Sequence, residues 1–376
     1  MAASTFVPGA HFETANVRNL LRQEGIEISE AMCLGIGGGI AAGYQYCPSV
    51  NNYEWLNGSG VQLIPRVKMM TTNGAWYRDT FERLGIAMDV RESTGKKAAA
   101  ANLLGGLEAG KWVVAWTTPL GLAQTLNWTA TCGMYSVLVR SVADGMVEYS
   151  DHLSVRKMDW EGFTAARDRV CSLKSRTMTI AAGGAKLDLK GAVTAGLRET
   201  AGDFVKPRLG TFNLPGLKEG VGLVNGKKNK RAWPVVFAGE RVLLPMRDLY
   251  ESIELGTGGG LMRPLYAEFL EEAAKLLGRK ELAVLAEQYR ELGERWTAFA
   301  EFLLPGEFAP AKEAMRRLAA GDRSQLETLE ELRKLPFPWD AQKIAAFLDE
   351  AAGRLGALYD GEVKASQQFT EVVGKL

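Results

Sequence analysis

His11-Phe12-Glu13-Thr14 opens the segment that decides the fold. Residues 13–24, which overlap it, carry apolar or small side chains three and four positions apart, a spacing that predicts a short amphipathic helix. Glu13 or Thr14 is suited to begin this helix, and Gly25 to end it. Two further motifs follow: Ser29-Glu30-Ala31-Met32, which predicts a second helical turn, and the glycine-rich Gly35-Ile36-Gly37-Gly38-Gly39.

Strand patterns follow these helices in the first 155 residues, at 61–67, 86–90 and 111–117, and in a hairpin of 134–142 and 146–150 closed at Asp144-Gly145. Helices first and strands later predict an α+β domain over residues 1–155, with an antiparallel sheet. Helical patterns then dominate, so residues 156–376 are expected to form a mainly helical second domain. Within it, residues 207–245 are rich in glycine and proline, which predicts a long surface loop.

Composition excludes several classes of function. The 45 basic and 44 acidic residues nearly balance, which gives no electrostatic reason to expect nucleic acid or an anionic membrane as a partner. No apolar run approaches the length of a membrane span, and Met1–Pro8 lacks the pattern of a signal peptide, so we expect a soluble, cytoplasmic protein. The cysteines form no CxxC pair, which favours buried free thiols over a metal site: Cys33, Cys47, Cys132 and Cys171. No cofactor is expected.

The three motifs of residues 11–39 resemble the N-terminal domain of the butirosin-biosynthesis H protein family. A second motif, Gly256-Thr-Gly-Gly-Gly-Leu-Met-Arg263-Pro-Leu-Tyr266, resembles that family's helical C-terminal domain. The resemblance implies a papain-like N-terminal domain and a role in making a specialised metabolite. The type member transfers an aminoacyl group from a carrier protein to an amine, which implies a cysteine thiolate at a helix start, a histidine base and an orienting acid.

This chain departs from that pattern at two of the three positions. Phe12 stands where the family has its nucleophile, and the place of the histidine falls near Gly133-Met134-Tyr135. Asp151 alone matches the third position. The chain has only two histidines, His11 and His152, and on a strand His152 would face away from Asp151.

Candidate site residues follow from these departures. His11, Glu13 and Asp151 are the candidates for residual catalysis, although capping and first-turn charge are the more frequent roles of such a histidine and glutamate. Phe12, Met134 and Tyr135 are expected to line an apolar ligand pocket, and Tyr44 and Arg263 are the other ligand-binding candidates. Residues 256–260 are interpreted as a helix-entry loop, with an anion site as the alternative.

Two functions are compatible with these residues. The first is a catalytically degenerate papain-like protein that binds a peptide or acyl intermediate for pathway enzymes or a carrier protein. Its pathway would make a specialised natural product, with a ribosomal peptide as one alternative. The second is an acyl or aminoacyl transferase, or a cyclase, that works without a cysteine nucleophile. Because Phe12 replaces the nucleophile, the non-catalytic hypothesis is favoured. A homodimer is a further hypothesis, and a structural subunit is the weakest alternative.

Overall fold

The computed structural model describes residues 5–47, 59–68, 75–117, 135–168, 173–184, 186–322 and 324–376. The chain divides into two compact units. The first contains the described residues up to Gly38 and those between Lys68 and Gly196, and the second contains Gly39–Val67 and Leu197–Leu376. This geometric division differs from the expected domain boundary after residue 155, which stays a prediction. Antiparallel sheets and a mainly helical C-terminal part confirm the predicted α+β class.

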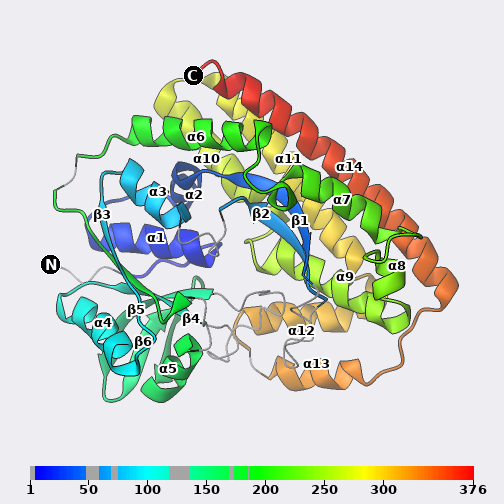
Figure 1. The fold of residues 1–376 in the computed structure, drawn as a ribbon, viewed down its shortest axis with the longest axis horizontal. Helices are drawn as coiled ribbons and strands as arrows, with labels where there is room; N and C mark the ends of the chain where they lie inside the picture. Colours follow the sequence, from blue (N-terminus) through cyan, green and yellow to red (C-terminus); the bar gives the residue numbers. More distant parts are fainter. Residues whose placement is uncertain are drawn as a thin grey trace. The chain divides into compact units, whose positions relative to one another are not determined.

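A six-stranded antiparallel sheet forms the centre of the first unit (Figure 1). Its strands, in spatial order, are β3 (Ala87–Arg91), β8 (Thr177–Ala181), β4 (Val113–Thr117), β5 (Tyr135–Ala143), β6 (Met146–Ser150) and β7 (Val155–Asp159). The predicted hairpin is confirmed: β5 and β6 pair around Asp144 and Gly145, whose φ angles of 52° and 72° suit a tight hairpin turn. The sequence patterns did not predict β7 and β8.

Helices pack on this sheet through an apolar cluster. The first unit contains α1 (Phe12–Gln23), α2 (Glu30–Gly37), α3 (Ala75–Arg83), α4 (Lys96–Glu108), α5 (Trp160–Asp168) and the first part of α6 (Leu189–Val205). Leu103 of α4 and Phe163 of α5 join alternate residues of β4, β5 and β6 in one buried cluster, and Phe12 packs at its margin. Because alternate strand residues share a face, these contacts define which face of the sheet α4 and α5 cover.

The second unit is helical apart from a two-stranded antiparallel hairpin, β1 (Ile40–Tyr46) and β2 (Val61–Arg66). Its helices are α7 (Leu214–Val224), α8 (Trp233–Val236), α9 (Leu243–Tyr250), α10 (Arg263–Leu277), α11 (Lys280–Leu303), α12 (Ala309–Ala319), α13 (Gln325–Arg333) and α14 (Ala341–Val373), with a π-helical turn at Glu251–Leu255 and 3-10 turns at Gly210–Phe212, Gly239–Val242, Gly260–Met262 and Gly306–Phe308. Helix α14 packs along α7 and α11 (Figure 1). No helix in the described part of the chain is long and apolar enough to cross a membrane.

The expected surface loop at residues 207–245 is wrong. Helix α7 lies within it, capped by the Asn213 side chain, which accepts a hydrogen bond from the Leu214 amide at 2.8 Å. Leu217 is fully buried. The glycines of this segment serve close packing: a Cβ on Gly220 would lie 2.5 Å from the Tyr44 ring. Composition indicated a loop because glycine serves both in turns and where two segments approach closely, and composition does not distinguish the two uses.

Candidate functional site

The start of α1 is held by a histidine cap. The Nδ1 atom of His11 accepts a hydrogen bond from the Glu13 amide at 3.3 Å, and the Thr14 hydroxyl oxygen lies 3.2 Å from the His11 carbonyl oxygen. His11 occupies the N-cap position with extended backbone angles, and Glu13 and Thr14, which were expected at the helix start, lie in the first turn. Glu13 is buried in the first turn, where its negative charge is favourable.

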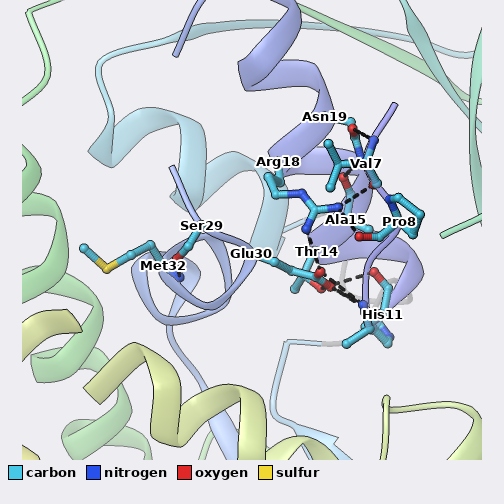
Figure 2. Close-up of polar contacts among 11 residues, drawn as sticks. Val7, Pro8, His11, Thr14, Ala15, Arg18, Asn19, Ser29, Glu30 and Met32 are labelled. Carbon is cyan, nitrogen blue, oxygen red and sulfur yellow. Dashed lines mark hydrogen bonds and ion pairs between the residues drawn. The ribbon is translucent and has the colours of Figure 1, made fainter. Parts of the chain in front are cut away.

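Glu30, the first residue of α2, ties the N-terminal segment to α1 (Figure 2). Its carboxylate accepts hydrogen bonds from the amides of Ala10 at 3.1 Å and His11 at 3.0 Å, and from the Thr14 hydroxyl at 2.7 Å. Arg18 completes the arrangement with an ion pair at 3.2 Å. The predicted second helix is confirmed, with Ser29 as its cap. Four donors on one carboxylate therefore fix residues 10–14 in place.

Phe12 and Tyr135, which the sequence placed in one pocket, are in contact. The Phe12 ring lies 4.4 Å from the Tyr135 ring and 4.2 Å from the His11 ring, measured between centroids. Phe12 is partly buried, whereas Tyr135 is only 3% exposed at the start of β5. Met134, the third predicted member of the pocket, lies outside the described residues. An aromatic pair therefore occupies the start of α1 and the start of β5.

The Tyr135 hydroxyl lies 2.8 Å from Nδ1 of His152. Burial raises the pKa of the Tyr135 phenol well above its ordinary value of 10, and the Asp151 charge adds to the rise. Burial also lowers the pKa of His152 below its ordinary value of 6.5, against the opposing effect of Asp151. At neutral pH the phenol is therefore protonated and the imidazole is neutral, so Tyr135 donates and His152 accepts.

Asp151 stabilises a turn that follows β6. Its Oδ1 atom accepts hydrogen bonds from the amides of Leu153 at 3.0 Å and Ser154 at 2.9 Å, and its Oδ2 atom forms an ion pair with Arg156. Strand β6 ends at Ser150, so the alternation expected for a strand does not apply to residues 151 and 152. This turn lets His152 reach Tyr135, a contact that the sequence reasoning missed. The sequence signal for this contact was that the chain has only two histidines, His11 and His152.

Tyr44 and Arg263 both lie in the second unit, and both are buried. The Tyr44 hydroxyl accepts a hydrogen bond from the Trp233 indole at 2.9 Å. Arg263 donates to Glu362 at 2.8 and 3.0 Å and to the backbone carbonyl of Ala41 at 2.7 Å. These contacts link β1, α10 and α14 and account for the burial of the arginine charge. Ligand binding by either residue stays a prediction.

The glycine-rich loop at residues 256–260 is occupied by a carboxylate of the protein. The Gly260 amide donates to Glu254 at 3.3 Å, and the Thr257 hydroxyl donates to the Ile253 carbonyl at 2.6 Å. A carboxylate at this amide favours the interpretation as a helix-entry loop over an anion site.

Among the described residues, no cluster of histidine, cysteine and acidic side chains could hold a metal ion. Cys33 is fully buried in α2, Cys47 is a partly buried free thiol, and Cys132 and Cys171 lie outside the described residues.

Comparison with known proteins separates the chain into two matched segments. Residues 11–123 match the family model described as butirosin biosynthesis protein H, N-terminal. Residues 164–331 match a model described as a domain of unknown function, DUF4872. No curated protein matches the chain. The first match begins at the His11 cap and includes Phe12 and the Glu30 carboxylate. Residues 11–123 are therefore similar to the N-terminal domain of butirosin biosynthesis protein H.

Proposed function

We propose that the protein takes part in biosynthesis of a specialised natural product, as a catalytically degenerate papain-like protein that binds a peptide or acyl intermediate. The observation that supports this is Phe12 at the first residue of α1, in contact with Tyr135 at the start of β5. A papain-like acyltransferase needs a thiolate at that helix start. A phenyl ring there offers apolar surface and no nucleophilic atom.

The neighbouring polar groups do not replace the missing nucleophile. The raised pKa of the Tyr135 phenol keeps it protonated, and a protonated phenol is a poor nucleophile. At the helix start, the His11 ring accepts the Glu13 amide hydrogen, so this donor is not available to stabilise an anion. The arrangement therefore favours binding over covalent transfer.

Phe12 and His152 give the site a partly exposed apolar ring and a partly exposed polar ring, both in contact with buried Tyr135. An acyl or peptide group can cover the ring and form a hydrogen bond with the imidazole. Covering about 100 Å² of apolar surface contributes roughly 2.5 kcal/mol, or nearly a hundredfold in affinity. Carrier proteins or pathway enzymes are the proposed partners. A homodimer and a cytoplasmic location remain predictions.

The hydroxyl–imidazole contact supports the second candidate, an acyl or aminoacyl transferase or cyclase without a cysteine. Tyr135 and His152 lie within the hydrogen-bond reach that general acid–base catalysis requires. Positioning alone lowers a barrier by several kcal/mol, so a degenerate site can still accelerate a reaction. Under this hypothesis, release of thiol from a thioester depends on His152.

The experiment measures binding and turnover together, on the full chain. The probes are the hexanoyl and alanyl thioesters of N-acetylcysteamine, titrated by calorimetry while thiol release is followed by chromatography. We expect saturable binding of at least one probe, thiol release at the buffer rate, and roughly tenfold or greater weakening by Phe12→Ala. Trp160→Ala is the matched control, because Trp160 is also the first residue of a helix and packs, partly buried, at the margin of the same apolar cluster.

Three results discriminate between the candidates. Binding that Phe12→Ala weakens and Trp160→Ala preserves supports the binding function. Thiol release above the buffer rate, lost in His152→Gln, supports the transferase instead. Absence of binding by every probe, or equal weakening by both alanine variants, contradicts a binding site at Phe12.

A further inference from the structure

We propose that His152 donates a hydrogen bond from its Nε2 atom to an uncharged carbonyl oxygen of the bound group, with Tyr135 as the residue that positions this donor. The ligand class is an amide, ester or thioester whose apolar substituent lies on Phe12. This inference rests on the proposed binding function and specifies the chemistry of the same site.

The first step is the fixed position of the Tyr135 hydroxyl. Tyr135 is 3% exposed, and its ring packs against Phe12, so the phenol has little freedom to move. The hydroxyl lies 2.8 Å from Nδ1 of His152. A phenol has one hydrogen, and a protonated phenol facing a neutral imidazole nitrogen donates it. Nδ1 of His152 is therefore the acceptor.

The second step is the tautomer that this contact selects. A neutral imidazole that accepts at Nδ1 carries its hydrogen on Nε2. Among the described residues, Tyr135 is the hydrogen-bond partner of the His152 ring. The backbone of His152 is also fixed, because its carbonyl accepts the Gly9 amide at 2.7 Å. Nε2 is thus a preorganised donor on a residue of intermediate burial.

The third step concerns the charge of the acceptor. Asp151 and Glu30 place negative charge in the field of His152, and Arg156 is already paired with Asp151. Glu30 is likewise paired with Arg18. A carboxylate ligand would therefore meet a neutral imidazole and arginines that already have carboxylate partners, whereas an uncharged carbonyl needs no counter-charge. The surroundings therefore favour an uncharged acceptor.

The tautomer is measurable without any ligand. The protein is labelled with ¹⁵N-histidine, and long-range ¹H–¹⁵N spectra at about pH 7.5, where an ordinary imidazole is neutral, distinguish the two tautomers. The two histidines give two sets of signals, and His152→Gln assigns them. We expect the Nε2–H form for His152 and a mixture of tautomers in Tyr135→Phe. An Nδ1–H form, or an imidazolium at this pH, would overturn the proposal.

The ligand class is tested with a matched pair of probes, N-acetylphenylalanine methylamide and N-acetylphenylalanine. We expect the methylamide to shift the His152 Nε2 signal saturably and to bind at least about tenfold more tightly than the carboxylate. His152→Ala should abolish binding, whereas His152→Gln, which retains an N–H donor, should weaken it less. Equal or tighter binding of the carboxylate contradicts the proposal.

This experiment separates the inference from the function on which it rests. Methylamide binding that shifts the Phe12 and Tyr135 ring protons, with the His152 Nε2 signal unchanged, overturns the inference and leaves the binding function standing. Failure of the methylamide to shift any of these signals overturns the inference as well. Turnover of the thioester probes contradicts the proposed function, whatever the tautomer of His152.

Discussion

Replacing Glu30 by glutamine tests whether one carboxylate fixes the start of α1. The side chain of Glu30 is 7% exposed and accepts hydrogen bonds from Ala10, His11, Thr14 and Arg18. Glutamine preserves the shape but replaces one acceptor oxygen with an amide that faces N–H donors. Either Arg18 alone, or both the His11 amide and the Thr14 hydroxyl, then lose their acceptor, because only the Ala10 amide contacts both oxygens.

The expected loss of stability follows from these contacts. A hydrogen bond to a charged group contributes about 1.5–3 kcal/mol, and removal of one member of a buried ion pair costs about 3–5 kcal/mol. We therefore expect Glu30→Gln to destabilise the first unit by about 3–4 kcal/mol. Glu27→Gln is the control, because Glu27 also pairs with an arginine of α1 but its side chain is 67% exposed. Its effect should stay below about 1 kcal/mol.

Urea denaturation followed by circular dichroism gives the free energy of unfolding, and hydrogen–deuterium exchange localises the change. A loss of about 3 kcal/mol corresponds to more than a hundredfold faster exchange in peptides of α1, if opening limits exchange. Glu30→Gln should also weaken binding of the thioester probes, because residues 10–14 position Phe12. The reasoning is refuted if Glu30→Gln and Glu27→Gln unfold within about 0.5 kcal/mol of each other.

Three further predictions follow from the structure. Burial lowers the pKa of His152 in the folded protein, so below about pH 6.5 the unfolded chain binds a proton that the folded chain does not. Stability should therefore fall as the pH drops from about 6.5 toward the lowered folded pKa. His152→Gln should flatten this pH dependence in urea midpoints, and an unchanged profile contradicts the assignment. Arg263→Met removes the ion-pair partner of the buried Glu362 carboxylate and should lower the free energy of unfolding by about 3–5 kcal/mol. The double variant Arg263→Met with Glu362→Leu should lose less stability than the sum of the two single variants. Additive losses in urea unfolding would argue against a buried pair. Phe12→Cys should not accumulate an acyl-enzyme in intact-mass spectra, because Nδ1 of His11 and Nδ1 of His152 are each held in a hydrogen bond; a stable thioester adduct would show that this expectation is wrong.

Local signals in the sequence predicted much of the fold. The helix expected at residues 13–24 is α1, Phe12–Gln23, and the turn at Asp144-Gly145 closes the hairpin as predicted. Strand β7 was missed because its alternating side chains are exposed and half-exposed, so it lacks an apolar face. Strand β8 pairs with β3 and β4, from which it is distant in the sequence, and a local pattern does not report such pairing.

The candidate site was predicted only in part. Phe12, Met134 and Tyr135 were expected to line one ligand pocket. Phe12 and Tyr135 are in contact, Met134 lies outside the described residues, and ligand binding by these residues stays a prediction. The role of His152 was missed because the strand was assumed to continue past Ser150, where the Asp151 turn begins. The hydrogen bonds of Glu30 were missed for a different reason. Its carboxylate oxygens bind backbone amides up to 20 residues away, and every residue except proline has a backbone amide, so the sequence does not mark which ones are bound.

The claim that the site binds acyl groups without covalent chemistry is tested most directly by intact-protein mass spectrometry. The full chain is incubated with an excess of the hexanoyl thioester of N-acetylcysteamine, at a concentration where calorimetry shows the site to be occupied. We predict that the protein keeps its unmodified mass over time and that the thioester is recovered intact. An acylated protein, or thiol released faster than in buffer and dependent on His152, would contradict the account.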